Sequence, residues 1–284
     1  GVDDVVINVH YFPEAVRAYV GDGARWGVRV TYLHEPELMG SAGAVRAVAD
    51  RFHETFVVIG CDDVTDIDLA AAIAYHRQRA AEATIVLARV DDVSQYGAVV
   101  TGPDGRITGF QEKPARGTER SRNANTGVYI FEPRVLERIP AETFYDFGKQ
   151  VFPALLAAGA AFYGMSQDAY WCDIGTPAEY RRAHADALHC RVKLRLPEGA
   201  SLDAGVLRGA GARVSAAAAI GSPACIGARS IVEEGAHVAD SILWQDVRVE
   251  RGAAVRGAVL GSGAVVAANA LVEGGEYGRG ARLP

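Results

Sequence analysis

The stretch from Arg213 to Val238, RVSAAAAIGSPACIGARSIVEEGAHV, places an aliphatic residue at every sixth position. These positions are Val214, Ile220, Ile226, Val232 and Val238. The same phase continues, with one step of five, at Val249, Val255, Leu260, Val266 and Val272. A disordered Ala/Gly/Val-rich tail is the alternative, but disordered segments lack such an ordered set of apolar residues. The period therefore predicts a repeat structure in which each unit buries one aliphatic side chain.

A hexapeptide repeat of this kind resembles the left-handed parallel β-helix, in which each six-residue unit forms one flat side of a triangular coil. In that fold the aliphatic residue points inward. We expect this domain to cover residues 195–284. Its coil ends and flat faces are exposed strand surfaces that need a partner or a cap, so we expect it to mediate homo-oligomer contacts.

Residues 1–194 show a different pattern, in which short apolar runs alternate with amphipathic segments. This alternation is typical of an α/β layer fold. Strands are expected at 5–9, 29–32, 55–59, 84–89, 97–100 and 126–131. Helices are expected at 13–20, 43–52, 69–81, 148–157 and 177–188. Asp66 and Asp68 stand at the start of the third helix, where acidic side chains cap free N–H groups.

Composition excludes several classes of partner. The net charge of -6 and the lack of any Lys/Arg run argue against a nucleic-acid surface. No apolar run approaches the roughly 18 to 20 residues that a membrane span needs, so no membrane partner is expected. The four cysteines form no CxxC pair and show no metal-ligand spacing. Reduced thiols in a cytoplasmic protein are therefore expected.

Two acidic motifs stand out in the α/β part. The sequence YWCDIGTP at 170–177 contains Asp173, and GCDD at 60–63 contains Asp62 and Asp63. Each motif places a carboxylate at the end of a predicted strand, and two such acids brought together suit a hard cation such as Mg²⁺. The structural alternative is that Asp62 and Asp63 merely end a strand and that Asp173 caps the next helix.

With FQEKP at 110–114 and NANTGVY at 123–129, these motifs resemble the sugar-1-phosphate nucleotidyltransferases over nearly the whole chain. The resemblance implies a Rossmann-like, GT-A-like α/β domain that transfers a nucleotidyl group from a nucleoside triphosphate to a sugar 1-phosphate. It implies that Asp62 and Asp173 are catalytic and hold Mg²⁺. It also implies that Lys113 is catalytic and contacts the sugar phosphate, for which an ammonium is a compact point charge.

The resemblance also implies a set of substrate-binding residues. Glu112 and Asn125 would hydrogen bond to sugar hydroxyls, and Gly97 would let the backbone approach the ring. The segment MGSAGA at 39–44 resembles the family's segment that packs against the nucleotide base, although a simple Gly-rich helix start is the alternative. Its implied contact residues are Gly40, Ser41 and Gly43.

One part of the family pattern is not found. Family members begin with a strand and a Gly-rich loop that wraps the triphosphate, whereas residues 1–8 match the region that follows that loop. The first strand lies centrally in such a sheet, so its loss leaves two rows of backbone groups unpaired. A fragment is the expected explanation, and an inactive relative or a partner chain that supplies the missing piece are the alternatives. Activity of residues 1–284 alone is left open.

Three hypotheses of function follow. The first is a nucleotide-sugar pyrophosphorylase, most like the mannose-1-phosphate guanylyltransferases, with glucose-1-phosphate uridylyl- or thymidylyltransferases as the alternative. The second is a non-catalytic regulatory subunit of the same family, although Asp62, Lys113 and Asp173 are all present. The third is an acyltransferase built on the β-helix, for which the repeats offer only His237 as a base.

Overall fold

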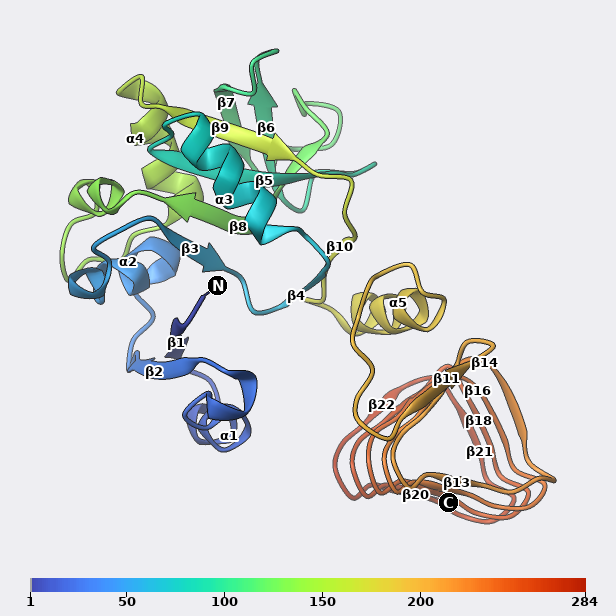
Figure 1. Cartoon of the computed structure of the whole chain (residues 1–284). Coiled ribbons are helices and arrows are strands. Elements are labelled where there is room, and N and C mark those ends of the chain that lie inside the picture. Colours follow the sequence, from blue (N-terminus) through green and yellow to red (C-terminus); the bar gives the residue numbers. More distant parts are fainter. Residues whose placement is uncertain (1) are drawn as a thin grey trace. The chain divides into compact units, whose positions relative to one another are not determined.

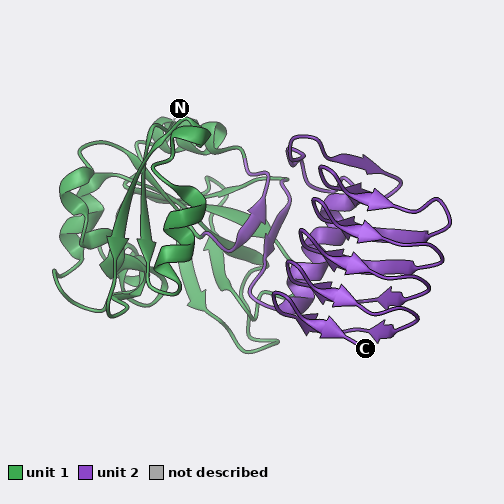
Figure 2. Ribbon diagram, turned by 90° about the horizontal axis from the view of Figure 1, so that it is seen from below, with its two compact units in different colours: residues 1–60, 68–168 green, residues 61–67, 169–284 purple. Residues whose placement is uncertain are grey.

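The computed structural model describes residues 2–284, and the chain falls into two compact units. Unit 1 consists of Gly1–Gly60 and Asp68–Asp168, and unit 2 consists of Cys61–Ile67 and Ala169–Pro284 (Figure 2). The division follows packing and places residues 61–67 and 169–194 in the unit that contains the repeats. The domain limits expected from the sequence, 1–194 and 195–284, stay a prediction.

The main sheet of unit 1 is arranged around one long central strand. Its strands are β3 (Phe56–Ile59), β5 (Ala83–Arg89), β6 (Gly97–Thr101), β7 (Ile107–Glu112), β8 (Asn123–Phe131) and β9 (Phe162–Ser166). The order is β7-β6-β8-β5-β9, and β3 also pairs with β8 (Figure 1). Only β5 and β9 run parallel, and the other pairs are antiparallel. Strand β8 therefore connects all parts of this sheet.

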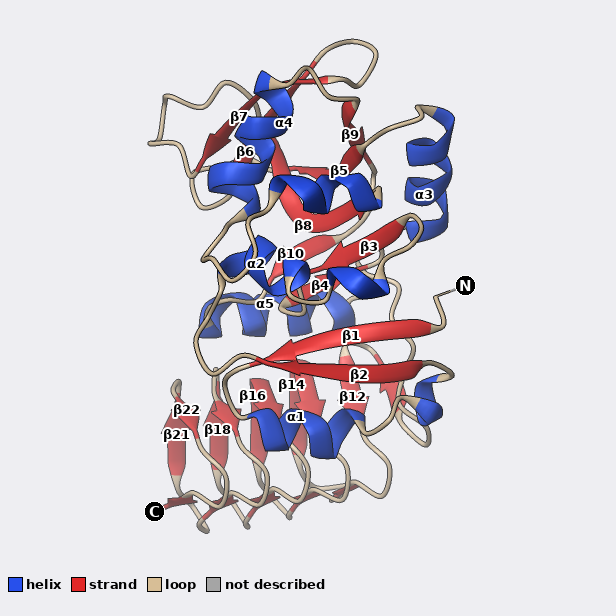
Figure 3. Ribbon diagram, turned by 90° about the vertical axis from the view of Figure 1, so that its left-hand side faces the viewer, coloured by secondary structure: helices blue, strands red, loops and turns tan. Residues whose placement is uncertain are grey.

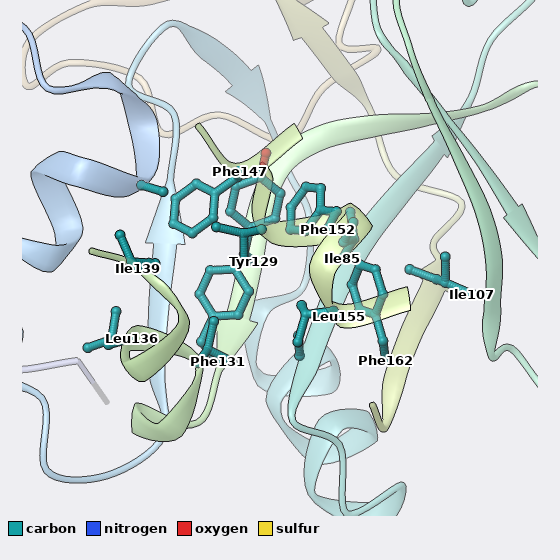
Figure 4. Close-up of a cluster of buried hydrophobic side chains, with 14 of the residues drawn as sticks. Ile85, Ile107, Tyr129, Phe131, Leu136, Ile139, Phe147, Phe152, Leu155 and Phe162 are labelled. Carbon is teal, nitrogen blue, oxygen red and sulfur yellow. The ribbon is translucent and has the colours of Figure 1, made fainter. Parts of the chain in front are cut away.

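Aromatic rings fill the core beside this sheet (Figure 4). Phe147 stacks on Phe131 with ring centroids 5.1 Å apart, and Phe152 stacks on Phe162 at 5.4 Å. Phe147 lies in the π-helix η4 (Phe147–Val151), and Phe152 begins the helix α4 (Phe152–Ala157). Because rings of this size bury a large apolar area, they fix the position of η4 against the sheet.

The N-terminal strands of unit 1 form a separate sheet. Strand β1 (Asp4–Val9) pairs in parallel with β2 (Arg29–His34), and helix α1 (Pro13–Val20) connects them (Figure 3). Within residues 2–284, β1 pairs only with β2, and β3 pairs only with β8. Ile59 at the end of β3 is 47% exposed. The unpaired strand edges expected from the sequence are therefore present.

The repeats of unit 2 form three columns of inward side chains. Val232 pairs with Val249 and Val249 with Val266, so one coil takes 17 residues. The second column contains Val238, Val255 and Val272, and the third contains Leu243, Leu260 and Tyr277. The result is a parallel solenoid of about four turns, consistent with a left-handed β-helix. The predicted fold class, an α/β domain followed by hexapeptide repeats, is confirmed.

The solenoid strands are short and belong to two sheets. One sheet contains β11 (Ser201–Asp203), β12 (Val206–Arg208), β14 (Ala219–Ile226), β16 (His237–Leu243), β18 (Ala254–Arg256), β19 (Val259–Leu260), β21 (Leu271–Glu273) and β22 (Glu276–Tyr277). The other contains β13 (Arg213–Val214), β15 (Ile231–Val232), β17 (Arg248–Val249), β20 (Val265–Val266) and β23 (Arg282–Leu283). Helix α5 (Pro177–Leu188) packs on β14 and β16.

Some of the predicted helices and strands match the structure and others do not. Helices α1 and α5 have the predicted bounds. The helix expected at 43–52 is wrong, because α2 (Gly40–Arg46) ends early and a separate 3₁₀ turn, η2 (Ala49–Arg51), follows. Two strands of the main sheet were not predicted, β7 and β9, and each has a glycine in its interior, which weakens the strand pattern.

Helix α3 (Leu69–Gln78) begins as expected. The Asp68 carboxylate accepts a hydrogen bond from the Ala71 N–H at 2.9 Å, as an N-cap. Asp66 does not cap this helix. Its carboxylate accepts instead from the N–H groups of Tyr170 at 2.8 Å and Lys193 at 3.0 Å. Only one of the two acids therefore has the predicted role.

Two expectations from composition can be compared with the structure. All four cysteines are free thiols, as predicted. Helix α5, with 12 residues, is too short to cross a bilayer, and no other helix within residues 2–284 is long and apolar enough to do so.

Candidate active site

The two acidic motifs meet in a short ladder of unit 2. Strand β4 (Asp63–Thr65) pairs antiparallel with β10 (Trp171–Asp173), and Asp63 lies directly opposite Asp173. The Ile174 N–H donates to the Asp62 carbonyl oxygen at 2.9 Å, which extends the pairing by one step. Residues directly opposite in such a ladder share one face of the sheet. The predicted meeting of the two motifs is found, although Asp62 lies in a turn beyond the end of β3.

Asp63 is the residue of this ladder that the sequence analysis did not select. Burial and the neighbouring charges of Asp62 and Asp173 raise the pKa of its carboxyl group to about 7. A hydrogen bond from the Trp171 side chain opposes that rise. Three carboxylates thus lie close enough to repel one another, and a bound cation would relieve that repulsion.

The alternative role of Asp173 as a helix cap is wrong. Thr176 caps α5, because its Oγ1 accepts a hydrogen bond from the Glu179 N–H at 3.2 Å and donates to the Glu179 carboxylate at 2.8 Å. The Asp173 Oδ1 accepts from the Gly175 N–H at 2.9 Å, which shapes the turn before the helix. The position of Asp173 is therefore set by a turn that is separate from the helix cap.

The oxygen donors of this ladder fit Mg²⁺. No three His, Cys, Asp or Glu side chains within residues 2–284 converge closely enough to hold a metal ion alone. Mg²⁺ in proteins commonly takes one or two carboxylates and completes its coordination with water and substrate phosphates. Asp62 and Asp173 can supply those carboxylates. Their role as metal ligands stays a prediction.

The residues implied for sugar binding gather in unit 1, at the edge of three neighbouring strands. Gly97 at the start of β6 is the register partner of Glu112 at the end of β7. A Cβ atom on Gly97 would lie 3.3 Å from the Cβ of Asn125 on β8 and 2.6 Å from the Phe110 ring. A side chain at 97 would therefore have to displace the Phe110 ring. The structure brings Gly97, Glu112 and Asn125 together, and their contact with a sugar stays a prediction.

The backbone around Lys113 is strained. Lys113 has φ of +42°, which is uncommon for a residue other than glycine, and Pro114 follows it. Its N–H donates to the Tyr96 carbonyl oxygen at 3.1 Å, which holds this conformation. Strained conformations of this kind cluster at ligand sites, since the surrounding structure must maintain them.

The Asn125 amide is already hydrogen bonded on both sides. Its Nδ2 donates to the Tyr129 hydroxyl at 3.0 Å, and its Oδ1 accepts from the Gly127 N–H at 3.1 Å. These bonds fix the orientation of the side chain. Nδ2 keeps one further hydrogen for a ligand. A single hydrogen bond to a sugar hydroxyl is therefore compatible with this geometry.

Glu112 has charged neighbours that the sequence analysis did not select. Its Oε2 lies 2.5 Å from the position that a Cβ of Gly148 would occupy. Burial and the charge of Asp146 raise the pKa of Glu112, and the charges of Lys113 and Lys149 oppose the rise. Asp146, Gly148 and Lys149 lie at η4, far from Glu112 in sequence. No local pattern around Glu112 pointed to them.

The predicted base-binding segment at the start of α2 holds a loop of the same unit. The N–H groups of Ala42 and Gly43 both donate to the Tyr145 carbonyl oxygen at 3.0 Å. A Cβ on Gly40 would lie 2.5 Å from that oxygen. Ser41 Oγ accepts from the Phe147 N–H at 3.0 Å. These two N–H groups are not available to an anion, and contact of Gly40, Ser41 and Gly43 with a base stays a prediction.

Comparison with known proteins identifies the family of this chain. The nucleotidyl transferase family matches residues 1–189. A UTP–glucose-1-phosphate uridylyltransferase of Synechocystis is 34% identical over 282 residues, covering 88% of this chain and 73% of that protein. A mannose-1-phosphate guanylyltransferase of Mycobacterium tuberculosis is 31% identical over 255 residues, covering 88% and 69%.

Solved structures show the same fold at lower identity. HddC of Yersinia pseudotuberculosis superposes with a TM-score of 0.55 at 24% identity, covering 64% of this chain and 78% of that one. A Bacillus anthracis protein solved with sucrose gives 0.58 at 22%, covering 67% and 78%. Since the family match covers most of the α/β part and relatives above 30% identity span most of the chain, the chain belongs to the nucleotidyl transferase family.

Proposed function

We propose that this chain makes GDP-mannose and pyrophosphate from GTP and mannose 1-phosphate. A phosphate oxygen of the sugar 1-phosphate attacks the α-phosphorus of the nucleotide, and the bond from that phosphorus to the pyrophosphate oxygen breaks. The protein forms no covalent bond in this reaction, so its residues act by positioning and by compensating charge. The observation that carries the proposal is the β4–β10 ladder, which brings the two acidic motifs together.

Each cluster has a role in the proposed reaction. Lys113 would contact the sugar phosphate, and Glu112 and Asn125 would accept and donate hydrogen bonds to sugar hydroxyls. Asp62 and Asp173 would hold Mg²⁺, which when bound supplies positive charge against the phosphate oxygens. Burial and the neighbouring charges of Asp62 and Asp173 raise the pKa of Asp63, and the repulsion among these charges supports a cation at this place.

The second candidate is UDP-glucose formation from UTP and glucose 1-phosphate. The uridylyltransferase of Synechocystis, at 34% identity, favours it. The guanylyltransferases of Mycobacterium tuberculosis and of rice, at 31% and 30%, favour mannose 1-phosphate.

We further propose that the protein is a cytoplasmic homo-oligomer whose copies contact one another through the solenoid. Four free thiols support the cytoplasmic location. Outward apolar residues of the solenoid such as Leu271, which is 62% exposed, support the contact.

The test is Mg²⁺-dependent pyrophosphate release by the purified chain. GTP with mannose 1-phosphate is run beside UTP and dTTP with glucose 1-phosphate. Turnover with GTP and mannose 1-phosphate is expected, and preference for a uridine or thymidine nucleotide would replace this assignment with the second candidate. No turnover with any pair, from a chain shown to be folded, would favour a fragment or a regulatory subunit over a catalyst.

The metal assignment has its own test. Asp173→Asn should lower kcat by about 10³-fold or more, since it removes one charge that holds the cation. Asp203→Asn is the matched control, because Asp203 is an exposed aspartate of β11 in the same unit. Calorimetric titration with Mn²⁺ gives a second readout. Full activity and unchanged Mn²⁺ binding in Asp173→Asn would rule out Asp173 as a ligand.

A further inference from the structure

Lysine is rare in this chain, and its placement is uneven. Of 29 cationic residues only three are lysines, Lys113, Lys149 and Lys193, and the rest are arginines. Two of the three lie next to the carboxylate of Glu112 along the fold: Lys113 follows Glu112 in sequence, and Lys149 follows Gly148, on which a Cβ would lie 2.5 Å from Glu112 Oε2. Their charges both act on this carboxylate. Arginine serves as the cation almost everywhere else. A lysine at both positions therefore suggests a need for a compact ammonium group.

Lys149 is held at this place by packing and capping on either side. Phe147, two residues earlier, is fully buried in the aromatic core. The Asp146 Oδ1 accepts from the Gly148 N–H at 3.0 Å and caps η4. Gly148 contacts the Glu112 carboxylate, which a side chain at 148 would displace. A π-helix turn of this kind is often found at functional sites.

Neither ammonium group is used in a short ion pair. Among the salt bridges formed within residues 2–284, none involves Lys113 or Lys149. Both side chains are exposed. Their charges act on Glu112 from a greater distance. Both therefore keep three N–H donors for a ligand.

The four charged groups match a ligand that has both hydroxyls and a phosphate. Carboxylates such as Glu112 and Asp146 accept hydrogen bonds and suit hydroxyl donors. Ammonium groups such as Lys113 and Lys149 only donate, and suit phosphate oxygens. A phosphate monoester carries nearly two negative charges at neutral pH, so two cations compensate it better than one. A sugar phosphate combines both kinds of group.

We propose that Lys149 is a second phosphate-binding residue, which with Lys113 binds the phosphate group of the sugar 1-phosphate. This inference rests on the proposed function, because it assigns Lys149 to the sugar-phosphate substrate of the same reaction. The sequence motifs placed this site only at the strand edge around Glu112. Lys149 extends the site to η4. Lys149 is then a specificity residue for the phosphate end of the sugar.

The first test uses the scarcity of lysine. The purified chain is acetylated with a limiting reagent, with and without mannose 1-phosphate or glucose 1-phosphate, and each lysine is quantified by mass spectrometry. Both Lys113 and Lys149 should be acetylated at least about threefold more slowly with the bound sugar phosphate, as expected for ammonium groups in direct contact. Lys193, which lies in unit 2, is the internal control and should not change.

The outcomes of this test separate the two proposals. Protection of both Lys113 and Lys149 supports the inference. Protection of Lys113 alone overturns the inference and leaves the proposed function in place. No protection of any lysine at saturating concentrations of either sugar phosphate contradicts both the inference and the proposed substrate class.

The second test is kinetic and uses three variants. Lys149→Ala should raise KM for the sugar 1-phosphate by about 10- to 100-fold, the range for losing one charge-assisted hydrogen bond. KM for the nucleoside triphosphate should change less than about twofold. Lys149→Arg should restore part of the affinity, because it keeps the charge. Lys193→Ala is the matched control and should leave both KM values unchanged.

A purely structural role for Lys149 would give a different result. It would lower activity without a selective change in KM for the sugar 1-phosphate, and Lys149→Arg would give no recovery. Either result overturns the inference. Circular dichroism of each variant confirms that the fold is kept, so that a KM change reports binding.

Discussion

The solenoid and the N-terminal strands differ in how completely their backbone groups are paired and their side chains are buried. In the solenoid each coil pairs with the next at a constant register, and Val249, Val255 and Leu260 are completely buried. In unit 1, β1 and β3 each keep an edge that no other strand of residues 2–284 pairs with. Strand β1 also has only one fully buried residue, Val9. Stability is thus expected to be high in the repeats and low in β1 and β2.

The acidic ladder differs from the solenoid in the same way. Inward positions of the repeats are aliphatic and mutually supportive, whereas β4 and β10 place like charges opposite each other. Local conflicts of this kind are typical of functional sites, because the ligand supplies what the free protein lacks. The solenoid is thus a region built by packing, whereas the acidic ladder is the region to which the proposed function assigns cation binding.

The largest expected effect is on hydrogen exchange. Amides of β16 and β18 should exchange at least about 10³-fold more slowly than those of β1, since the former open only with the solenoid core. Exchange monitored by mass spectrometry on peptides covering 237–256 and 4–9 measures both. Equal protection of the two regions would contradict the comparison.

The next effect is on core packing. Leu260→Ala should lower the free energy of unfolding by about 2–5 kcal/mol, because it leaves a cavity in a fully buried column. The matched change Val6→Ala in β1 should cost less than about 1 kcal/mol, since Val6 is partly exposed. Unfolding in denaturant can be followed for each unit, because Trp26 lies in unit 1 and Trp171 and Trp244 lie in unit 2. A similar loss in both variants would break the distinction.

A smaller effect sharpens the comparison within unit 1. Gly40→Ala should cost about 2–4 kcal/mol, because it adds a clash with the Tyr145 carbonyl oxygen to the strain of a positive φ. Gly117→Ala is the matched control, because Gly117 also has a positive φ but no atom lies within 4 Å of the added Cβ. It should cost about 1 kcal/mol. Equal losses of stability in Gly40→Ala and Gly117→Ala would show that the 143–145 loop moves to accommodate the added Cβ. The α2 segment would then be as weakly held as β1.

The smallest effect is the pH dependence of the acidic ladder. The pKa of Asp63 is about 7 in the folded protein and 3.8 as a model value, so the folded state binds the proton more tightly. This stabilisation is complete below about pH 4 and is lost as pH rises to about 7. Because the side chain is partly exposed, the loss should be only about 1–2 kcal/mol.

Asp63→Asn should remove that part of the pH dependence. Denaturant unfolding at several pH values between 4 and 8 measures it, with Asp203→Asn as the control. A wild-type slope that persists in Asp63→Asn would contradict the assignment to this carboxyl group.

Several features followed from sequence alone. The period of six identified inward residues of all three solenoid columns, because each flat side of the coil buries one side chain. The bounds of α1 and α5 were also predicted, since Pro13 and Pro177 favour the first helical position. The two acidic motifs were recognised from YWCDIGTP and GCDD, and the structure places them side by side.

Other features depended on the tertiary structure. The pairing of Asp63 with Asp173 is a matter of strand register, which two segments more than a hundred residues apart do not encode locally. The charge of Lys149 acts on Glu112 because the aromatic core fixes η4 against the sheet. The start of α2 holds the 143–147 loop because the N–H groups of Ala42 and Gly43 donate to the Tyr145 carbonyl oxygen. Local patterns determine which elements form, and long-range packing decides which side chains meet.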